Sequence, residues 1–178
     1  DLYSHSVQFY YPPRIEYKST ELIDIGEQDR FYRQLQTEMP QSPVSMMSVE
    51  KIRFLTELMW SGLRNPGSIV EMGVWQGGSS WAMAKLLRHL GETRPLYMID
   101  LFESHAMDRT ATMCNDEIVR QMAFYGHAHL LMGLVDDERI LGPLRGQPIC
   151  FAHFDLGYIP RALEFLWDHL QPGSPLLL

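Results

Sequence analysis

The chain has few cysteines, no long hydrophobic run and no cluster of positive charge. Cys114 and Cys150 are its only cysteines, and they lie far apart without a C-x-x-C motif. This spacing indicates two reduced thiols rather than a disulfide framework or a cysteine zinc site. No apolar run reaches the ~18 residues of a membrane span, and no signal peptide is visible. We therefore expect a cytoplasmic protein that does not associate with a membrane.

The lack of a basic stretch also limits the partners that the chain can bind. The formal net charge is −7, which disfavours a nucleic-acid backbone as a partner. With 46% hydrophobic and 21% charged residues, the composition is that of an ordinary globular protein. The 178 residues suffice for one domain with a sizeable core.

One stretch, Ser68–His105, reads as strand, glycine turn, helix, strand and acid. A short apolar run begins at Ile69, and Glu71–Gly78 predicts a turn. Ser79 or Ser80 is expected to cap the helix that follows, because hydroxyl side chains accept hydrogen bonds from the free N–H groups of a first turn.

The helix is expected to end at Gly91, and a second apolar run, Leu96–Ile99, ends in Asp100. A strand–helix–strand unit of this size favours two parallel strands joined by a right-handed crossover. Its ligand site is expected beyond the carboxyl ends of the strands, where the glycines and Asp100 converge.

The turn indicates which ligand this site takes. It reads E-x-G-x-x-x-G-G rather than the dinucleotide pattern G-x-G-x-x-G, and it lacks the lysine of a phosphate-binding loop. The Glu71 carboxylate beside the turn would repel a pyrophosphate, whereas Asp100 is placed to accept hydrogen bonds from two ribose hydroxyls. A ligand with an amino group, a ribose and no phosphate fits, and S-adenosylmethionine (SAM) is such a ligand.

The segment Val70–Ser80, VEMGVWQGGSS, resembles the first motif of the macrocin-type O-methyltransferases, V-E-x-G-V-W-x-G-G-S. Ile99–Glu103 is similar to the D-x-F-E string of that family. The resemblance implies a class I enzyme that uses SAM to methylate a hydroxyl, usually of a sugar, on a small-molecule natural product. It also implies a Rossmann-like α/β fold, with a mostly parallel central sheet and helices on both faces. The sequence leaves a homo-oligomer open.

Hydrophobic periodicity divides the chain into an N-terminal arm and helical extension, residues 1–66, and a SAM-binding core, residues 67–178. A class I methyltransferase has seven strands and only five can be counted, so we expect the last strands to be missing. Residues 1–27 predict an irregular arm, and residues 104–115 a loop over the pocket. Helices are expected at Gln28–Glu38, Val49–Leu63, Asp116–Tyr125 and from Pro160, and further strands at His129–Met132, Ile149–Asp155 and from Leu176.

Candidate catalytic residues end the fourth predicted strand. The family has D-x-D-x-Y there, and the resemblance implies base and metal functions for its acids. This chain reads Asp155-Leu156-Gly157-Tyr158, so one acid of the pattern is missing. We predict Asp155 as the base or a Mg²⁺ ligand, and His153 as a second candidate base.

The predicted SAM-binding residues lie in the turn and after the second and third strands. Met46 and Met47 are a further candidate pair near the sulfonium, with packing in the core as the alternative. The residues predicted to bind SAM are Glu71, Gly73, Trp75, Gly77, Gly78, Ser79, Asp100, Phe102, Gly133 and Leu134, with Val135 beside them.

Three alternatives stay open. The incomplete acid pattern is compatible with a catalytically silent SAM-fold module that acts as a binding partner. An NAD(P)-dependent oxidoreductase is disfavoured because the dinucleotide pattern is absent. Cephalosporin hydroxylase-type sequences share the first motif, so a hydroxylase-associated protein is the third alternative.

Overall fold

The computed structural model describes residues 25–39, 45, 47–102 and 115–178. Several features predicted from the sequence lie outside these residues, and they stay predictions. They are the arm up to residue 24, the loop at 104–114, Met46, Glu103 and Cys114.

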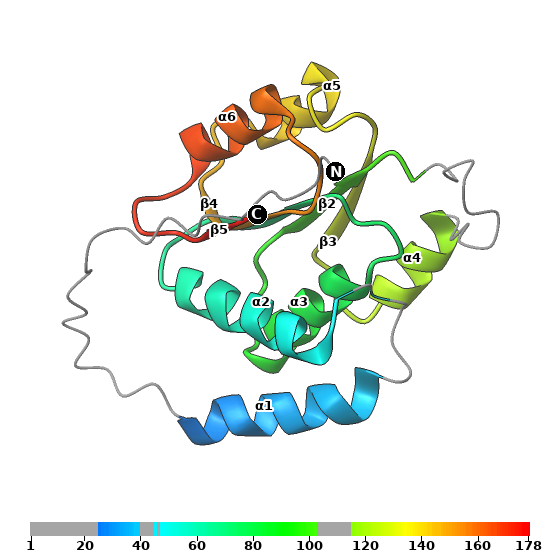
Figure 1. Cartoon of the computed structure of the whole chain (residues 1–178), viewed down its shortest axis with the longest axis vertical. Helices are drawn as coiled ribbons and strands as arrows, with labels where there is room; N and C mark the ends of the chain where they lie inside the picture. The colour runs from blue at the N-terminus through cyan, green and yellow to red at the C-terminus, as the bar shows by residue number, and fades with distance from the viewer. Residues whose placement is uncertain (1–24, 40–44, 46, 103–114) are drawn as a thin grey trace, which may run out of the picture.

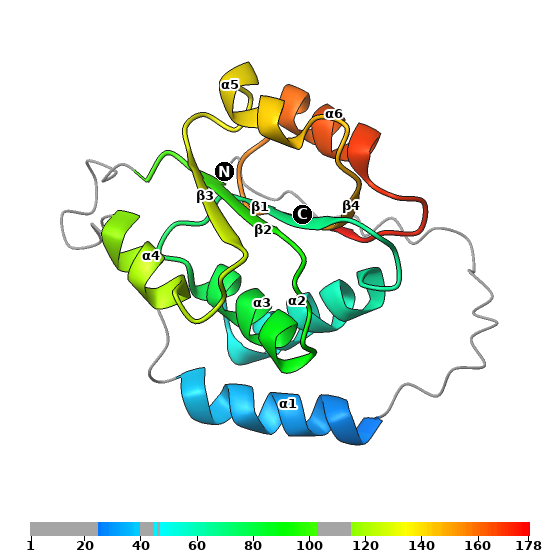
Figure 2. The same cartoon turned by 180° about the vertical axis from the view of Figure 1, so that it is seen from behind.

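Five parallel strands form one sheet in the order β3-β2-β1-β4-β5 (Figures 1 and 2). All five strands predicted from the apolar runs are present, which confirms the mostly parallel α/β sheet. The strands are β1 (Ser68–Met72), β2 (Leu96–Asp100), β3 (Ala128–Met132), β4 (Ile149–Phe154) and β5 (Leu176–Leu177).

The two central strands are buried along their whole length. Every residue of β1 and of β4 is buried, because helices cover both faces of the sheet at these strands. A parallel strand covered on both faces is expected to be a near-continuous apolar run, as ICFAHF in β4 is. The two ionisable exceptions among the carboxylates and imidazoles of these strands, Glu71 and His153, therefore need a partner.

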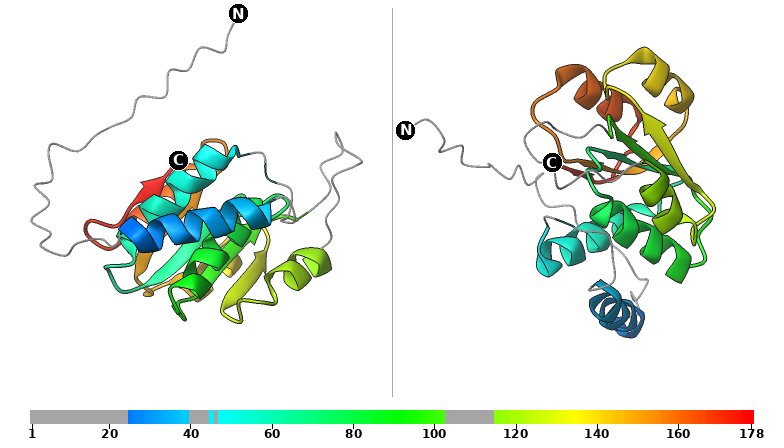
Figure 3. Two further views of the ribbon diagram at one scale, coloured as in Figure 1. Left: turned by 90° about the horizontal axis from the view of Figure 1, so that it is seen from below. Right: turned by 90° about the vertical axis from the view of Figure 1, so that its right-hand side faces the viewer.

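Helices lie on both faces of the sheet (Figures 1 and 3). The helices α2, α3 and α4 cover one face, whereas α5, the short 3-10 helix η2 and α6 cover the other. Helix α1 packs outside α2 and α3 as a further layer. The helices are α1 (Ile25–Glu38), α2 (Val49–Gly62), α3 (Gly78–His89), α4 (Asn115–Met122), α5 (Glu138–Leu141), η2 (Gly142–Leu144) and α6 (Pro160–His169).

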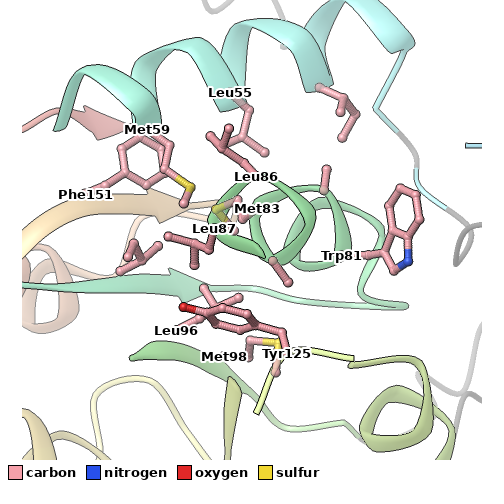
Figure 4. Close-up of a cluster of buried hydrophobic side chains, with 14 of the residues drawn as sticks. Leu55, Met59, Trp81, Met83, Leu86, Leu87, Leu96, Met98, Tyr125 and Phe151 are labelled. Carbon is pink, nitrogen blue, oxygen red and sulfur yellow. The ribbon is translucent and has the colours of Figure 1, made fainter. Parts of the chain in front are cut away.

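Two hydrophobic clusters hold these layers together, one on each face of the sheet. The first packs Leu55 and Met59 of α2 against Met83 of α3 and Phe151 of β4 (Figure 4). Burying each of these side chains contributes roughly 1.5–3 kcal/mol. The second cluster lies under α5 and α6 and includes Val70, Ile99, Ala152, Phe165 and Leu166.

The N-terminal extension shares the first cluster. Phe31 and Leu35 of α1 are buried in it, as is Leu55 of α2. The division of the chain at residue 66 stays a prediction, since α1 and α2 pack onto the same core as the strands. In the part of the chain that the structure describes, no helix is both long and apolar enough to cross a membrane.

Helix α2 begins as predicted, whereas α3 does not. The Ser48 side chain accepts a hydrogen bond from the N–H of Lys51 at the start of α2. At α3 the N-cap residue is Gly77, in the left-handed conformation at φ 83°, and no side chain caps the helix. The prediction that Ser79 or Ser80 caps α3 is wrong, because the Ser80 hydroxyl points to a carboxylate below the helix instead.

Strand β4 carries one extra residue relative to β1. Ser68 pairs with Ile149, but the next residue, Ile69, pairs with Phe151, so Cys150 is left without a counterpart. This is the geometry of a β-bulge. Beyond it the pairing is regular, and Glu71 lies opposite His153.

Candidate functional site

The strand order reverses between β1 and β4, which marks the carboxyl end of these two strands as the candidate ligand site. The chain runs outward from β1 through β2 to β3, and then returns to add β4 on the other side of β1. In open α/β sheets the ligand site lies where the order reverses in this way. The loops that leave β1, β2, β3 and β4 at this edge contain the residues predicted as the site.

Near the carboxyl ends of β1 and β4, Glu71 and His153 form a buried pair across the two strands. Their side chains are 0% and 4% exposed, and His153 Nδ1 lies 2.9 Å from Glu71 Oε1. The Ser80 hydroxyl, on the first turn of α3, donates to the other oxygen of Glu71. Glu71 therefore ties together β1, β4 and α3, directly under the turn that joins β1 to α3.

This pair also affects the protonation of His153. Burial of the imidazole opposes its cationic form, but the hydrogen bond and negative charge of Glu71 outweigh burial. The charge of Asp155 adds to this effect, and the net result is a raised pKa for His153. The cationic imidazole and the carboxylate then compensate each other, as buried charges must.

Asp100, at the end of β2, accepts hydrogen bonds from two loops. Its Oδ2 atom lies 2.7 Å from the backbone nitrogen of Val74 and 2.9 Å from that of Trp75, both in the turn after β1. Its Oδ1 atom lies 3.2 Å from the nitrogen of Phe102, in the loop after β2. A carboxylate has about four acceptor sites, so these contacts leave capacity for a ligand hydroxyl.

Two residues held by Asp100 have strained backbones. Trp75 at φ 50° and Phe102 at φ 52° are the two non-glycine residues with positive φ in the described part of the chain. A bulky residue in this conformation costs on the order of 1–3 kcal/mol and is found mostly at functional sites. Hydrogen bonds to a charged group, worth about 1.5–3 kcal/mol each, offset this cost.

The predicted glycines of the turn serve different purposes. Gly73 has φ 90°, and a Cβ there would lie 2.8 Å from the Leu156 Cγ and still closer to the Asp155 carbonyl oxygen. At Gly77 a Cβ would make only ordinary contacts with α4, so its φ of 83° is what favours glycine there. Gly78 begins α3 and is buried.

Two polar side chains beside this turn are nearly buried. Gln76 and Ser79 are each 8% exposed, and no hydrogen bond of either side chain occurs within the described residues. Neither is among the fully buried side-chain groups without a partner, so the polar atoms of both remain accessible to water or to a ligand. The first turn of α3 also presents backbone N–H groups at its amino end. This arrangement suits a polar or negatively charged ligand group.

The loop after β3 also contacts Asp100. The N–H of Gly133 donates to the Asp100 carbonyl oxygen at 2.9 Å, and a Cβ on Gly133 would lie 2.6 Å from Ile140 Cγ1. Leu134 is 55% exposed, whereas Val135 is buried in the cluster under α6. Of the residues predicted to bind SAM in this loop, Leu134 is therefore the one with an accessible side chain.

Asp155 follows β4 and is exposed, and its N–H donates to the Met72 carbonyl oxygen. Tyr158 is 84% exposed, and Gly157 stands where the family pattern has its second acid. Within residues 25–39, 45, 47–102 and 115–178, no three His, Cys, Asp or Glu side chains are arranged to hold a metal ion. The described residues alone do not fit a Mg²⁺ site, and Asp155 as a metal ligand stays a prediction.

Sequence reasoning placed most of these residues at one edge but missed three features. It treated Ser80 only as a helix cap, it did not identify Gln76, and it did not pair Glu71 with His153. A polar residue inside each of two adjacent buried strands is the signal that could have indicated that pair.

The comparisons with known proteins agree with this geometry. The model of the macrocin O-methyltransferase family matches residues 6–126, more than half of the chain. A tetracenomycin 4′-O-methyltransferase of Streptomyces olivaceus, which acts on a dimethoxyrhamnosyl derivative, is 36% identical over 95 residues. That match covers 47% of this chain, which spans only 36% of the length of the relative.

Solved structures show the same fold. The O-methyltransferase NovP has a TM-score of 0.61 at 20% identity, with 74% of this chain and 65% of NovP covered. The calicheamicin methyltransferase CalS11 has a TM-score of 0.59 at 20% identity, with 87% of this chain and 78% of CalS11 covered. These likenesses confirm the Rossmann-like fold predicted from the sequence. The family match over residues 6–126 shows that the chain belongs to the macrocin O-methyltransferase family.

Proposed function

We propose that this protein transfers a methyl group from SAM to a hydroxyl, most readily a sugar hydroxyl, of a small-molecule natural product. The observation that carries the proposal is the turn from Gly73 to Ser79. It lies at the point where the strand order reverses, and two nearly buried polar side chains beside it have no partner within the described residues. A phosphate-free ligand fits, because the turn lacks both the dinucleotide pattern and the lysine of a phosphate-binding loop.

The residues of this edge fit the parts of SAM. Ser79, Gln76 and the amino end of α3 suit its amino-acid group, which carries a carboxylate. Asp100 has acceptor capacity left for a ribose hydroxyl, and the exposed side chain of Leu134 suits the adenine ring. When bound, SAM supplies an electrophilic methyl group on a sulfonium.

The acceptor hydroxyl must lose its proton as it attacks, and Asp155 is the group that would take it. Asp155 is exposed immediately after β4, at the same edge as the turn. His153 is 3% exposed and its Nδ1 contacts Glu71, so it is better suited to hold the end of β4 against β1 than to contact the acceptor. We therefore assign the base to Asp155 and a positioning role to His153.

The name of the Streptomyces olivaceus relative supports a deoxysugar as the acceptor. Because this chain spans little more than a third of that relative, the acceptor remains part of the proposal. We propose a glycosylated polyketide or similar antibiotic precursor as the class to test first. Mg²⁺ would assist only if ligands beyond the described residues joined Asp155.

Calorimetry of the purified protein with S-adenosylhomocysteine, SAM and NAD tests the cofactor. Binding of the first two and not of NAD is expected, whereas binding of NAD alone would contradict the proposal. A methyl-transfer assay with rhamnosylated aromatic polyketides, with and without EDTA, tests the reaction. SAM binding without transfer to any hydroxyl acceptor would favour a catalytically silent module, and an effect of EDTA would show a role for metal.

A further inference from the structure

We propose that Asp100 is a positioning residue that holds two loops of the site in their ligand-ready shape before any ligand binds. Its side chain accepts the N–H groups of Val74 and Trp75 in the turn after β1, and that of Phe102 in the loop after β2. One carboxylate therefore links the loops that follow two adjacent strands. This role is additional to the direct contact with a ribose hydroxyl that the sequence predicts.

The strained residues are the reason for this inference. Trp75 and Phe102 have positive φ, and each donates its backbone N–H to the Asp100 carboxylate. A backbone in this conformation persists only where its surroundings hold it. Neither residue is a glycine, so each has a side chain that disfavours positive φ. The conformation therefore depends on the hydrogen bonds to Asp100.

The consequence for the site is the position of the Trp75 side chain. Trp75 is 38% exposed and lies in the turn between the carboxyl end of β1 and the start of α3. Without the Asp100 carboxylate, the turn is expected to relax to negative φ at Trp75 and to carry the indole and the neighbouring Gln76 to new positions. Asp100 therefore sets which side chains face the ligand.

Amide hydrogen exchange of the ligand-free protein tests this inference independently of its function. Asp100→Asn keeps the size of the side chain but loses its charge and one acceptor oxygen. We expect the N–H groups of Val74, Trp75 and Phe102 to exchange about tenfold faster or more in this variant. Unchanged exchange at all three would overturn the proposal.

Two further variants control the measurement. Asp100→Ala removes all three side-chain hydrogen bonds and is expected to give the larger effect. If Asp100→Ala fails to fold, amide exchange of Asp100→Asn still tests the proposal, provided that the circular dichroism spectrum of this variant matches that of the original protein. Asp168→Asn removes an exposed carboxylate near the end of α6. Leu170, just after this helix, pairs with Ile149 at the amino end of β4, so Asp168 lies at the edge of the sheet opposite the site. This variant should leave the exchange of the three amides unchanged.

Binding of two ligands separates positioning from direct contact, and this part rests on the proposed function. The ligands are S-adenosylhomocysteine and an analogue without both ribose hydroxyls. If Asp100 positions the loops, Asp100→Asn weakens both by a similar factor, about tenfold. If it acts only through the ribose, the analogue binds the variant and the original protein equally, which would overturn the proposal. If neither ligand binds the original protein, the proposed function fails, and the amide exchange still decides the role of Asp100.

Discussion

Replacing His153 by leucine should destabilise the protein strongly, because it leaves the Glu71 carboxylate buried without its cationic partner. The two side chains are 4% and 0% exposed, and the Ser80 hydroxyl would remain as the partner of Glu71 within the described residues. Breaking one side of a buried pair costs about 3–5 kcal/mol. A domain of ordinary stability has about 5–15 kcal/mol in total, so the loss would be large.

A double replacement tests the physical reason for this loss. Glu71→Leu combined with His153→Leu removes both charges and keeps a similar side-chain volume. Replacing a whole buried pair by hydrophobic residues is often neutral or stabilising. The double variant should therefore be more stable than either single variant, although it would lose the contact to α3 that Ser80 makes. Urea unfolding at pH 7, followed by circular dichroism, measures all four proteins.

An exposed ion pair provides the matched control. Arg53 and Glu57 lie 2.9 Å apart on α2, with side chains 57% and 40% exposed. Glu57→Gln should cost only about 0.3–0.5 kcal/mol, since water screens this pair. The reasoning is refuted if His153→Leu costs no more than Glu57→Gln, or if the losses of the two single variants at Glu71 and His153 simply add in the double variant.

Three further outcomes are expected. Because the folded state raises the pKa of His153, its stabilising contribution is complete below the ordinary pKa of about 6.5 and is lost as pH rises through the folded pKa. Urea unfolding at a series of pH values should show this loss in the original protein and not in His153→Gln. Gly73→Ala should destabilise the protein and abolish SAM binding, because at φ 90° the new Cβ would overlap backbone atoms of Asp155. The matched control is Gly91→Ala, which also has a positive φ, 68°, but no atom within 4 Å of the new Cβ. This control should cost only about 1–2 kcal/mol and keep SAM binding. Lys85→Met should loosen α1, because Lys85 Nζ lies 2.6 Å from Glu38 Oε2 at the end of α1 and is held over two aromatic rings. Limited proteolysis should then cleave α1 faster than in the original protein.

The strands and the position of the site could be predicted from the sequence for a physical reason. Strands covered on both faces appear as short apolar runs, and the turn residues between them need little space. The strand at Ile149–Asp155 and the glycine turn after Ile69 could therefore be predicted from the sequence alone.

The contacts within the site could not be predicted, because they depend on which residues the fold brings opposite each other. Glu71 and His153 are 82 residues apart in the chain and meet only through the β1–β4 register. The sequence assigned Asp100 to a ligand, yet three of its partners are backbone N–H groups, which no side-chain pattern reveals. The cap of α3 failed as a prediction because Ser80 has a stronger partner in Glu71.

The unmatched residue in β4 marks a place where this strand can change its length. Cys150 and Phe151 both belong to the cluster under α2 and α3, whereas Ile149 and Ala152 belong to the cluster under α5 and α6. The bulge therefore absorbs one residue without changing the face or the β1 partner of the residues that follow it. Deleting Cys150 would leave a regular ladder in which His153 still lies opposite Glu71, and the loss would be confined to the packing of a buried thiol and its contact with Arg94.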